Sequence, residues 1–297
     1  MSRIREYGAD FLLLLVALAW GSTFFIVQDA IRETPVYVFL FWRFLFAAIL
    51  MSLISYKKLI LIDRQILKAG ILLGIFMFLG FAFQTFGLLF TYSSTVAFVT
   101  GLNVIIVPLL LFMIFKKTAS PYSIFGAVCA AFGLYFLTLH SAIGFGKGEF
   151  YSLVCAFMFA SHIVFTDKYS KKYNVLLLVT IELFTVAVLS LLAAVIFDKT
   201  IMPSAFDGVF LNAIIITVVF ATVFAFGVQT AMQRYTTPAK TAIIFTLEPV
   251  SAGFFGYFFA NEVFSLQQSI GAFLIIFGML SAELGTYVRN KKRDLDA

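Results

Sequence analysis

The sequence has little charge and almost no cysteine. Only 12% of its 297 residues are charged and 62% are hydrophobic, whereas a soluble domain has about 25% charged residues. Such a chain cannot cover its apolar residues with a polar surface, which excludes an ordinary water-soluble fold and predicts that lipid is its solvent. Its two cysteines, Cys129 and Cys155, lie in apolar runs and offer neither a disulfide framework nor metal-ligand spacing.

The absence of several sequence motifs narrows the range of functions that the chain can have. No glycine-rich loop ends in Lys-Ser or Lys-Thr, so a phosphate-binding loop for ATP is missing. A His-Glu-x-x-His run and paired aspartates, which an intramembrane enzyme would use, are missing too. Ser161 and His162 are adjacent, so on a helix they point about 100° apart and cannot form a dyad with each other. We therefore expect no enzyme, no cofactor and no metal site.

What the sequence does contain is a series of apolar stretches of membrane-spanning length. About 20 mostly apolar residues cross the hydrocarbon layer. The first stretch follows basic residues but lacks a small-residue cleavage site, so we interpret it as a retained helix. Ten segments qualify, at residues 9–28, 36–56, 67–90, 93–115, 121–139, 148–166, 174–196, 208–232, 239–260 and 265–288. They predict an all-α integral membrane protein with ten transmembrane helices.

The basic residues predict the orientation of these helices. Of the 21 Lys and Arg residues, 17 fall at the termini or in one set of alternate loops and three in the other set, while Arg43 lies inside a span. Loops rich in Lys and Arg stay in the cytoplasm, so both termini are predicted to be cytoplasmic. Because the positive charge is spread over short loops, it indicates membrane topology and no nucleic-acid partner.

The second half of the chain repeats the first. Trp42-Arg43-Phe44 matches Ile181-Glu182-Leu183 at an offset of 139 residues, and Gln84-Thr85 matches Gln229-Thr230 at 145. Gly126 and Gly133 match Gly271 and Gly278, also at 145. Each half, residues 1–141 and 142–297, holds five predicted spans. Five is odd, so the halves are predicted to be inverted repeats, an architecture of secondary transporters with the solute site where the halves meet.

Several short motifs resemble a known family. Ala19-Trp20-Gly21-Ser22-Thr23-Phe24, Trp42-Arg43-Phe44, Thr100-Gly101-Leu102-Asn103 and Val107-Pro108-Leu109 resemble the first EamA repeat of the drug/metabolite transporter superfamily. Thr237-Pro238-Ala239, Leu247-Glu248-Pro249-Val250, Asn261-Glu262 and Gly271-Ala272 resemble the second. The resemblance implies ten helices in two inverted halves, a central cavity lined by spans 1, 3, 4, 6, 8 and 9, and export of amino acids, other metabolites or drugs in exchange for protons. Asn261-Glu262-Val263 and Phe159-Ala160-Ser161-His162 depart from the family pattern.

Three charged residues are predicted to lie near the middle of the membrane, where charge is costly and usually faces a cavity or a partner. Arg43 is interpreted as a structural charge, held by backbone carbonyls or by a carboxylate, with Glu182 as a candidate partner. Glu248 is a candidate for proton coupling, because burial disfavours a bare negative charge, and Glu182 is a second one. The alternative for Glu248 is that it caps backbone amides at a helix break.

Two prolines and a set of polar or aromatic side chains complete the candidate site. Pro108 and Pro249 remove backbone donors and are predicted to break their helices, which either exposes backbone at a cavity or only kinks the packing. His162 is either a solute or proton group or a hydrogen-bonded core residue. Gln84 and Gln229 are predicted nearer the ends of their spans, as gates or interhelical hydrogen bonds. The predicted cavity residues are Trp20, Ser22, Thr23, Gln84, Asn103, Ser161, His162 and Gln229.

These observations favour a secondary transporter in the cytoplasmic membrane of a bacterium. Its expected partners are a small-molecule solute, protons and the lipid bilayer, and it is either a monomer or a homodimer. An intramembrane enzyme is one alternative, and a receptor or scaffold, which would not need an inverted repeat, is another. Transport of labelled metabolites by the purified protein in liposomes separates these functions.

Overall fold

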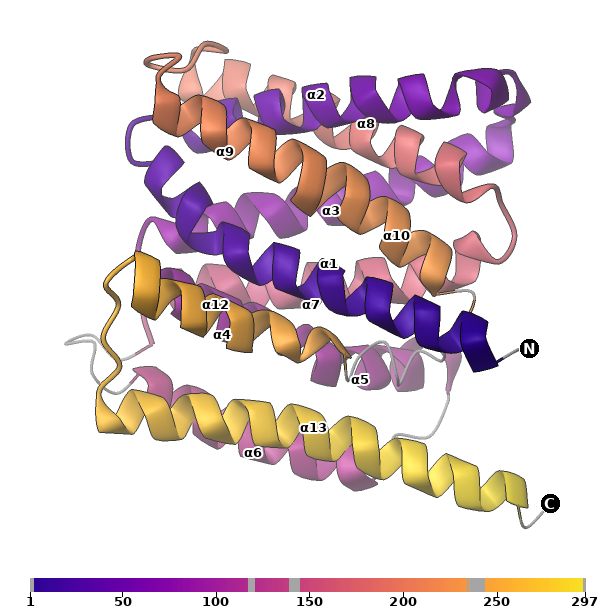
Figure 1. Cartoon of the computed structure of the whole chain (residues 1–297), viewed down its shortest axis with the longest axis vertical. Helices are drawn as coiled ribbons and strands as arrows, with labels where there is room; N and C mark the ends of the chain where they lie inside the picture. Colours follow the sequence, from indigo (N-terminus) through magenta and orange to yellow (C-terminus); the bar gives the residue numbers. More distant parts are fainter. Residues whose placement is uncertain (1–2, 117–120, 139–144, 234, 236–243, 296–297) are drawn as a thin grey trace.

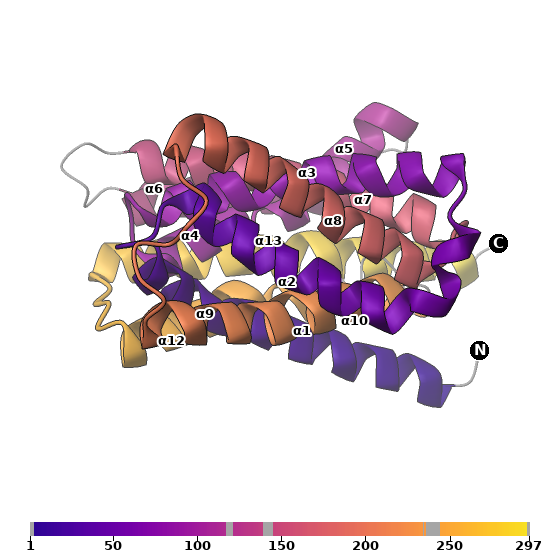
Figure 2. The same cartoon turned by 90° about the horizontal axis from the view of Figure 1, so that it is seen from above.

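The chain is folded almost entirely into helices. The computed structural model describes residues 3–116, 121–138, 145–233, 235 and 244–295, and these ranges contain no β-strand. The helices run roughly side by side along one direction (Figures 1 and 2). They are α1 (Arg3–Ala30), α2 (Val36–Ser55), α3 (Arg64–Leu88), α4 (Ser93–Thr100), α5 (Asn103–Phe115), α6 (Pro121–Thr138), α7 (Lys147–Ser170), α8 (Val175–Ala193), α9 (Gly208–Val218), α10 (Ala225–Met232), α12 (Leu247–Phe259) and α13 (Leu266–Leu295).

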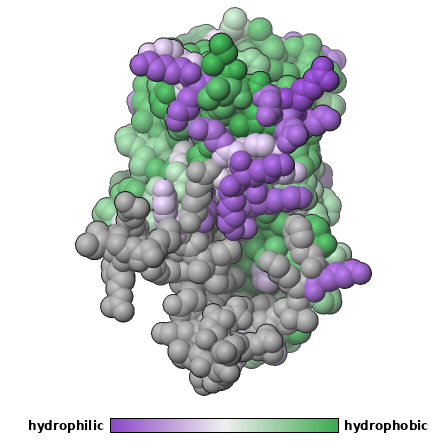
Figure 3. Space-filling view, turned by 90° about the vertical axis from the view of Figure 1, so that its right-hand side faces the viewer, coloured by the Kyte–Doolittle hydropathy of each residue, from purple (hydrophilic) through white to green (hydrophobic). Residues whose placement is uncertain are grey.

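Seven helical segments of the described chain are long and apolar enough to cross a membrane. They cover residues 8–30, 36–61, 64–88, 93–114, 147–170, 175–198 and 208–232, and shorter apolar helices cover 124–137 and 266–282. The all-α membrane fold predicted from the sequence is confirmed, while the count of ten spans stays a prediction. Both termini lie at the same end of the bundle (Figure 1). Hydrophilic side chains gather on that end (Figure 3).

Four of the membrane-length segments are not continuous α-helices. The segment at 36–61 continues from α2 into a 3₁₀-helical turn at Tyr56–Leu61. The segment at 93–115 breaks at Gly101 and Leu102, between α4 and α5. The predicted break at Pro108 is wrong, because this proline lies inside α5, where it costs one backbone hydrogen bond without ending the helix. Pro249 lies in the first turn of α12, where the missing donor would have no helical partner. The other two segments contain π-helical turns, at Ala194–Asp198 after α8 and at Val219–Phe224 between α9 and α10.

Glycines bring α6 and α13 into backbone contact. A Cβ atom added to Gly133 would lie 2.7 Å from the Gly271 carbonyl oxygen, and one added to Gly278 would lie 2.6 Å from the Gly126 carbonyl oxygen. These four glycines are the ones that the internal repeat matches, Gly126 with Gly271 and Gly133 with Gly278. Gly126 therefore contacts Gly278, which is the match of Gly133, and Gly133 contacts Gly271, which is the match of Gly126. A two-fold relation between the two halves would require such crossed contacts.

Two carboxylates hold the turn between α3 and α4. Glu262 accepts hydrogen bonds from the backbone amides and the hydroxyl groups of both Ser93 and Ser94. Glu149 accepts one from the Thr91 hydroxyl at 2.9 Å. An anionic side chain at a helix N-terminus satisfies unpaired amides and complements the helix dipole. From the sequence, Glu262 was recognised only as part of a motif, and this role was not predicted. The predicted boundary between the two halves, at residues 141 and 142, lies outside the described residues.

Candidate functional site

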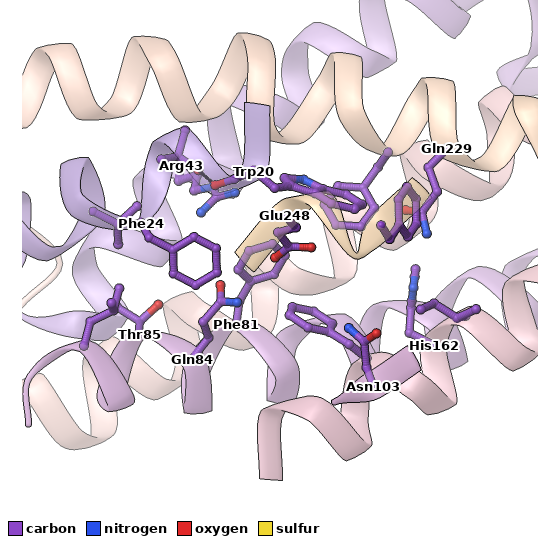
Figure 4. A pocket seen from close by; sticks show the side chains of 17 residues that line it. Trp20, Phe24, Arg43, Phe81, Gln84, Thr85, Asn103, His162, Gln229 and Glu248 are labelled. Atoms are coloured by element: carbon purple, nitrogen blue, oxygen red, sulfur yellow. Dashed lines mark hydrogen bonds between the residues drawn. The ribbon is translucent and has the colours of Figure 1, made fainter. Parts of the chain in front are cut away.

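A cavity lies inside the bundle, where helices from both halves of the chain meet. Its lining comes from α1, α2, α3, α5, α7, α10 and the region at the start of α12 (Figure 4). Eight polar or charged residues line it together with six aromatic side chains, which are called the aromatic wall. The polar group includes Arg43, Gln84, Asn103, His162, Gln229 and Glu248, and the aromatic wall is formed by Trp20, Phe24, Phe81, Phe159, Phe226 and Phe245.

The π-helical turn at Val219–Phe224 positions two of the cavity residues. Within it the Ala225 amide bonds to the Phe220 carbonyl, five residues back, and bypasses the carbonyl of Ala221. That Ala221 carbonyl accepts a hydrogen bond from the Trp20 indole nitrogen at 3.0 Å. The next residue, Thr222, accepts one from Nε of Arg43, also at 3.0 Å. Such turns occur often at functional sites, and this one ties α1 and α2 to the α9–α10 segment.

Arg43 is held differently from the sequence prediction. Its side chain is 3% exposed, and its guanidinium carbon lies 4.5 Å from the centre of the Phe81 ring and 5.2 Å from that of Phe44. A cation over aromatic faces is attracted by their negative charge density. Neither a carboxylate nor a backbone carbonyl holds it within the described chain, and Glu182 is not its partner. Arg43 therefore brings a positive charge to the cavity wall.

Glu248 contributes an acidic group to the cavity, where Arg43 contributes a basic one. It lies in the first turn of α12, is 8% exposed, and makes no hydrogen bond within the described chain. The proposed capping of backbone amides is therefore not seen among these residues. Gly21 makes the position possible, because a Cβ there would lie 2.6 Å from the Glu248 carbonyl oxygen, so only glycine lets α1 approach α12 this closely.

His162 and Glu182 form a buried pair between α7 and α8. The two side chains are 2% and 1% exposed, and Nε2 of His162 contacts Oε1 of Glu182. His162 lines the cavity, whereas Glu182 lies behind it and does not. The ring of His162 also packs edge-on against Phe226, with ring centres 5.9 Å apart.

Six of the eight predicted cavity residues line the cavity, and two do not. Ser22 and Ser161 instead donate their hydroxyl hydrogens to carbonyls of their own helices, Ala19 at 2.9 Å and Phe157 at 2.9 Å. Gln84 and Gln229, expected near the ends of their spans, lie in the cavity itself. The phenylalanines of the aromatic wall were not predicted, because composition gives no signal for them.

The lining is made of matched pairs at the repeat offsets. Residues 139 apart include Trp20 with Phe159 and Thr23 with His162. Residues 145 apart include Phe81 with Phe226, Gln84 with Gln229 and Asn103 with Glu248. The same kind of residue recurs in three pairs, while Thr23 with His162 and Asn103 with Glu248 differ in chemistry. The cavity thus combines a symmetric frame with unequal polar groups.

Comparison with known proteins identifies the family. The EamA-like transporter family matches residues 8–139 and 146–282. The chain belongs to this family. An uncharacterized transporter of Archaeoglobus fulgidus is 31% identical over 95% of this chain and 87% of that protein. The uncharacterized transporter YoaV of Bacillus subtilis is 25% identical over 90% of this chain and 94% of its own length.

A crystal structure with 18% sequence identity has the same fold. It aligns with a TM-score of 0.69 over 94% of this chain and 97% of that one. Family membership and the apolar helices together make the chain a membrane transporter. The cavity described above is therefore the place to look for the solute.

Proposed function

We propose that this protein is a secondary transporter that exports a small organic solute across the cytoplasmic membrane in exchange for protons, by alternating access. The observation that carries the proposal is the buried cavity between the two halves, lined by residues that match at the repeat offsets. Crossed contacts between Gly126, Gly133, Gly271 and Gly278 support an inverted relation of the halves. Rocking of one such half against the other would expose the cavity to each side in turn.

The lining favours a solute with groups of both signs and an apolar body. Arg43 can bind a carboxylate, and Glu248 can bind an ammonium group or a proton. The surrounding Trp and Phe side chains suit an apolar or aromatic portion. Amino acids with apolar side chains are the simplest solutes of this kind, and drugs with the same groups would also fit.

Glu248 is the proposed coupling residue. Its carboxyl group faces the cavity without a hydrogen-bond partner among the described residues, so a proton and the solute ammonium group can compete for it. Competition for one site gives exchange, because the solute leaves as the proton binds.

Liposomes containing the purified protein test the proposal. Labelled L-leucine and L-phenylalanine should show counterflow, and an imposed proton gradient should drive their uptake. Glu248→Gln keeps the shape of the side chain, so this variant should retain counterflow while gradient-driven uptake falls to the level of empty liposomes. Proton-driven uptake at the wild-type rate in the variant would assign coupling to another residue. The lack of any flux of these and other small metabolites would reject transport.

A further inference from the structure

Glu182 is a buried carboxyl group that the cavity itself does not use. Its Oε2 atom has no hydrogen-bond partner among the described residues, and its Oε1 atom contacts Nε2 of His162. Leaving a polar group buried without partners is costly. A buried acid in contact with one imidazole at a cavity wall therefore points to a role exerted through that imidazole.

The atoms in contact determine what His162 can offer to the cavity. An ionised carboxyl group only accepts hydrogen bonds, so with Glu182 in that form the imidazole carries its hydrogen on Nε2. The Nδ1 atom of a neutral imidazole is then an acceptor. Within the described chain Nδ1 makes no hydrogen bond of its own.

A second acceptor without a donor lies on the same wall. Oε1 of Gln229 is buried and unpartnered among the described residues, and the side chain lines the cavity. Phe226, which contacts the His162 ring, precedes Gln229 by one helical turn. Figure 4 shows His162 and Gln229 toward one end of the cavity and Arg43 toward the other. Two acceptors at this end, Nδ1 of His162 and Oε1 of Gln229, therefore have no donor among the described residues, and a bound solute could supply one.

We propose that Glu182 is a positioning residue that fixes His162 as the Nε2–H tautomer, so that Nδ1 accepts a hydrogen bond from a donor group of the solute. The foremost donor is the ammonium group that also binds Glu248, since an ammonium group has three hydrogens to donate. The proposal rests on the transport function above and assigns the orientation of the solute, with its acidic end toward Arg43. Glu182 and Arg43 occupy matched positions in the two halves. Arg43 thus acts on the cavity directly, and Glu182 acts through His162.

Nitrogen NMR of histidine tests this assignment without a transport assay. The chain has two histidines, so His140→Gln leaves His162 as the single signal in protein labelled with ¹⁵N-histidine. We expect the Nε2–H tautomer with Glu182 present and a mixture of tautomers in Glu182→Ala. The matched control is Ser190→Ala, which removes another buried polar group from α8 and should leave the imidazole signals unchanged. A His162 signal in the Nδ1–H form, or one that Glu182→Ala does not alter, would overturn the proposal.

Two small probes test the contact with the solute in the same sample. The amine 2-phenylethylamine carries an ammonium donor, whereas 3-phenylpropionate, a carboxylate of similar size, carries none. The Nδ1 signal should shift with the amine and stay in place with the acid. Equal shifts, or no shift with the amine, would remove the role assigned to Nδ1. Both probes are added to protein that retains Glu182, so they test the contact between Nδ1 and the solute even if Glu182→Ala fails to fold. A protein that passes them and shows no counterflow would lose the transport proposal instead.

Discussion

Arg43 and Glu182 are positioned by contacts that differ from what their spacing suggested. Arg43 and Glu182 match in the repeat and have opposite charge, which favoured a direct pair. In the structure each has its own partner, Thr222 for Arg43 and His162 for Glu182. Burial of a charge demands a partner, but sequence spacing does not say which of several polar groups will provide it.

The Arg43 and Glu182 contacts predict which pairs of substitutions are coupled. Arg43→Gln and Glu182→Gln should each lower the thermal stability of the detergent-solubilised protein, and their effects should add to within about 0.3–0.5 kcal/mol, as for residues without shared partners. Glu182→Gln combined with His162→Gln should deviate from additivity by about 0.5–3 kcal/mol, because these side chains touch. Recovery of stability in the Arg43→Gln, Glu182→Gln double variant would reinstate the direct pair.

Helical geometry explains which single residues were predicted well. Thr23 and His162 line the cavity, and their chain neighbours Ser22 and Ser161 do not. Successive residues point about 100° apart on a helix, and in these two pairs the rotation of the helix places the second residue, and not the first, against the cavity. The sequence predicted a set of polar side chains at this depth. Which of them face the cavity depends on the rotation of each helix about its axis, and only the packing of the helices determines that rotation.

At the scale of the helices, the predicted segments agree with the observed ones where a long run of apolar residues is enough to define a helix. The break before Asn103 and the π-helical turn at Val219–Phe224 were not predicted, since neither has a reliable sequence signal. The helix break predicted at Pro108 does not occur, because one lost hydrogen bond is tolerated inside a helix that neighbouring helices hold in place. The glycines that matched in the repeat were informative, because close backbone contact requires them.

Substitution of one glycine should therefore weaken the contact between α6 and α13. A Cβ on Gly126 would meet the Gly278 carbonyl oxygen and would lie 2.7 Å from the Ala282 Cβ. We expect Gly126→Ala to cost about 1–3 kcal/mol, the usual effect of overpacking, and to lower the melting temperature in detergent. Gly227→Ala is the control, because a Cβ there meets no atom within 4 Å and alanine favours a helix. Equal melting temperatures for the two variants would show that α6 and α13 are not in close contact.

At the scale of the whole molecule, the distribution of charge should set the orientation in the membrane. Both termini lie at one end of the bundle (Figure 1), and the basic loops of the sequence alternate with poorly charged ones. An even number of spans with cytoplasmic termini satisfies the preference of Lys and Arg for the cytoplasmic side. An odd number of spans would place the two termini on opposite sides of the membrane. The side on which a few loops lie therefore tests the predicted number of spans.

Cysteine labelling in intact cells tests this orientation. In a background without Cys129 and Cys155, single cysteines at Lys57 and Lys172 should be protected from a membrane-impermeant maleimide, and cysteines at Glu33 and Asn261 should react. All four positions are exposed in the structure, so protection must come from the membrane and not from burial. Thr34, although it lies in the same loop as Glu33, is 4% exposed and would be a poor reporter. Permeabilised cells provide the control, since all four sites should then react. A Lys172 cysteine that reacts in intact cells would contradict the ten-span topology, because the chain before Lys172 would then cross the membrane a number of times other than the predicted six.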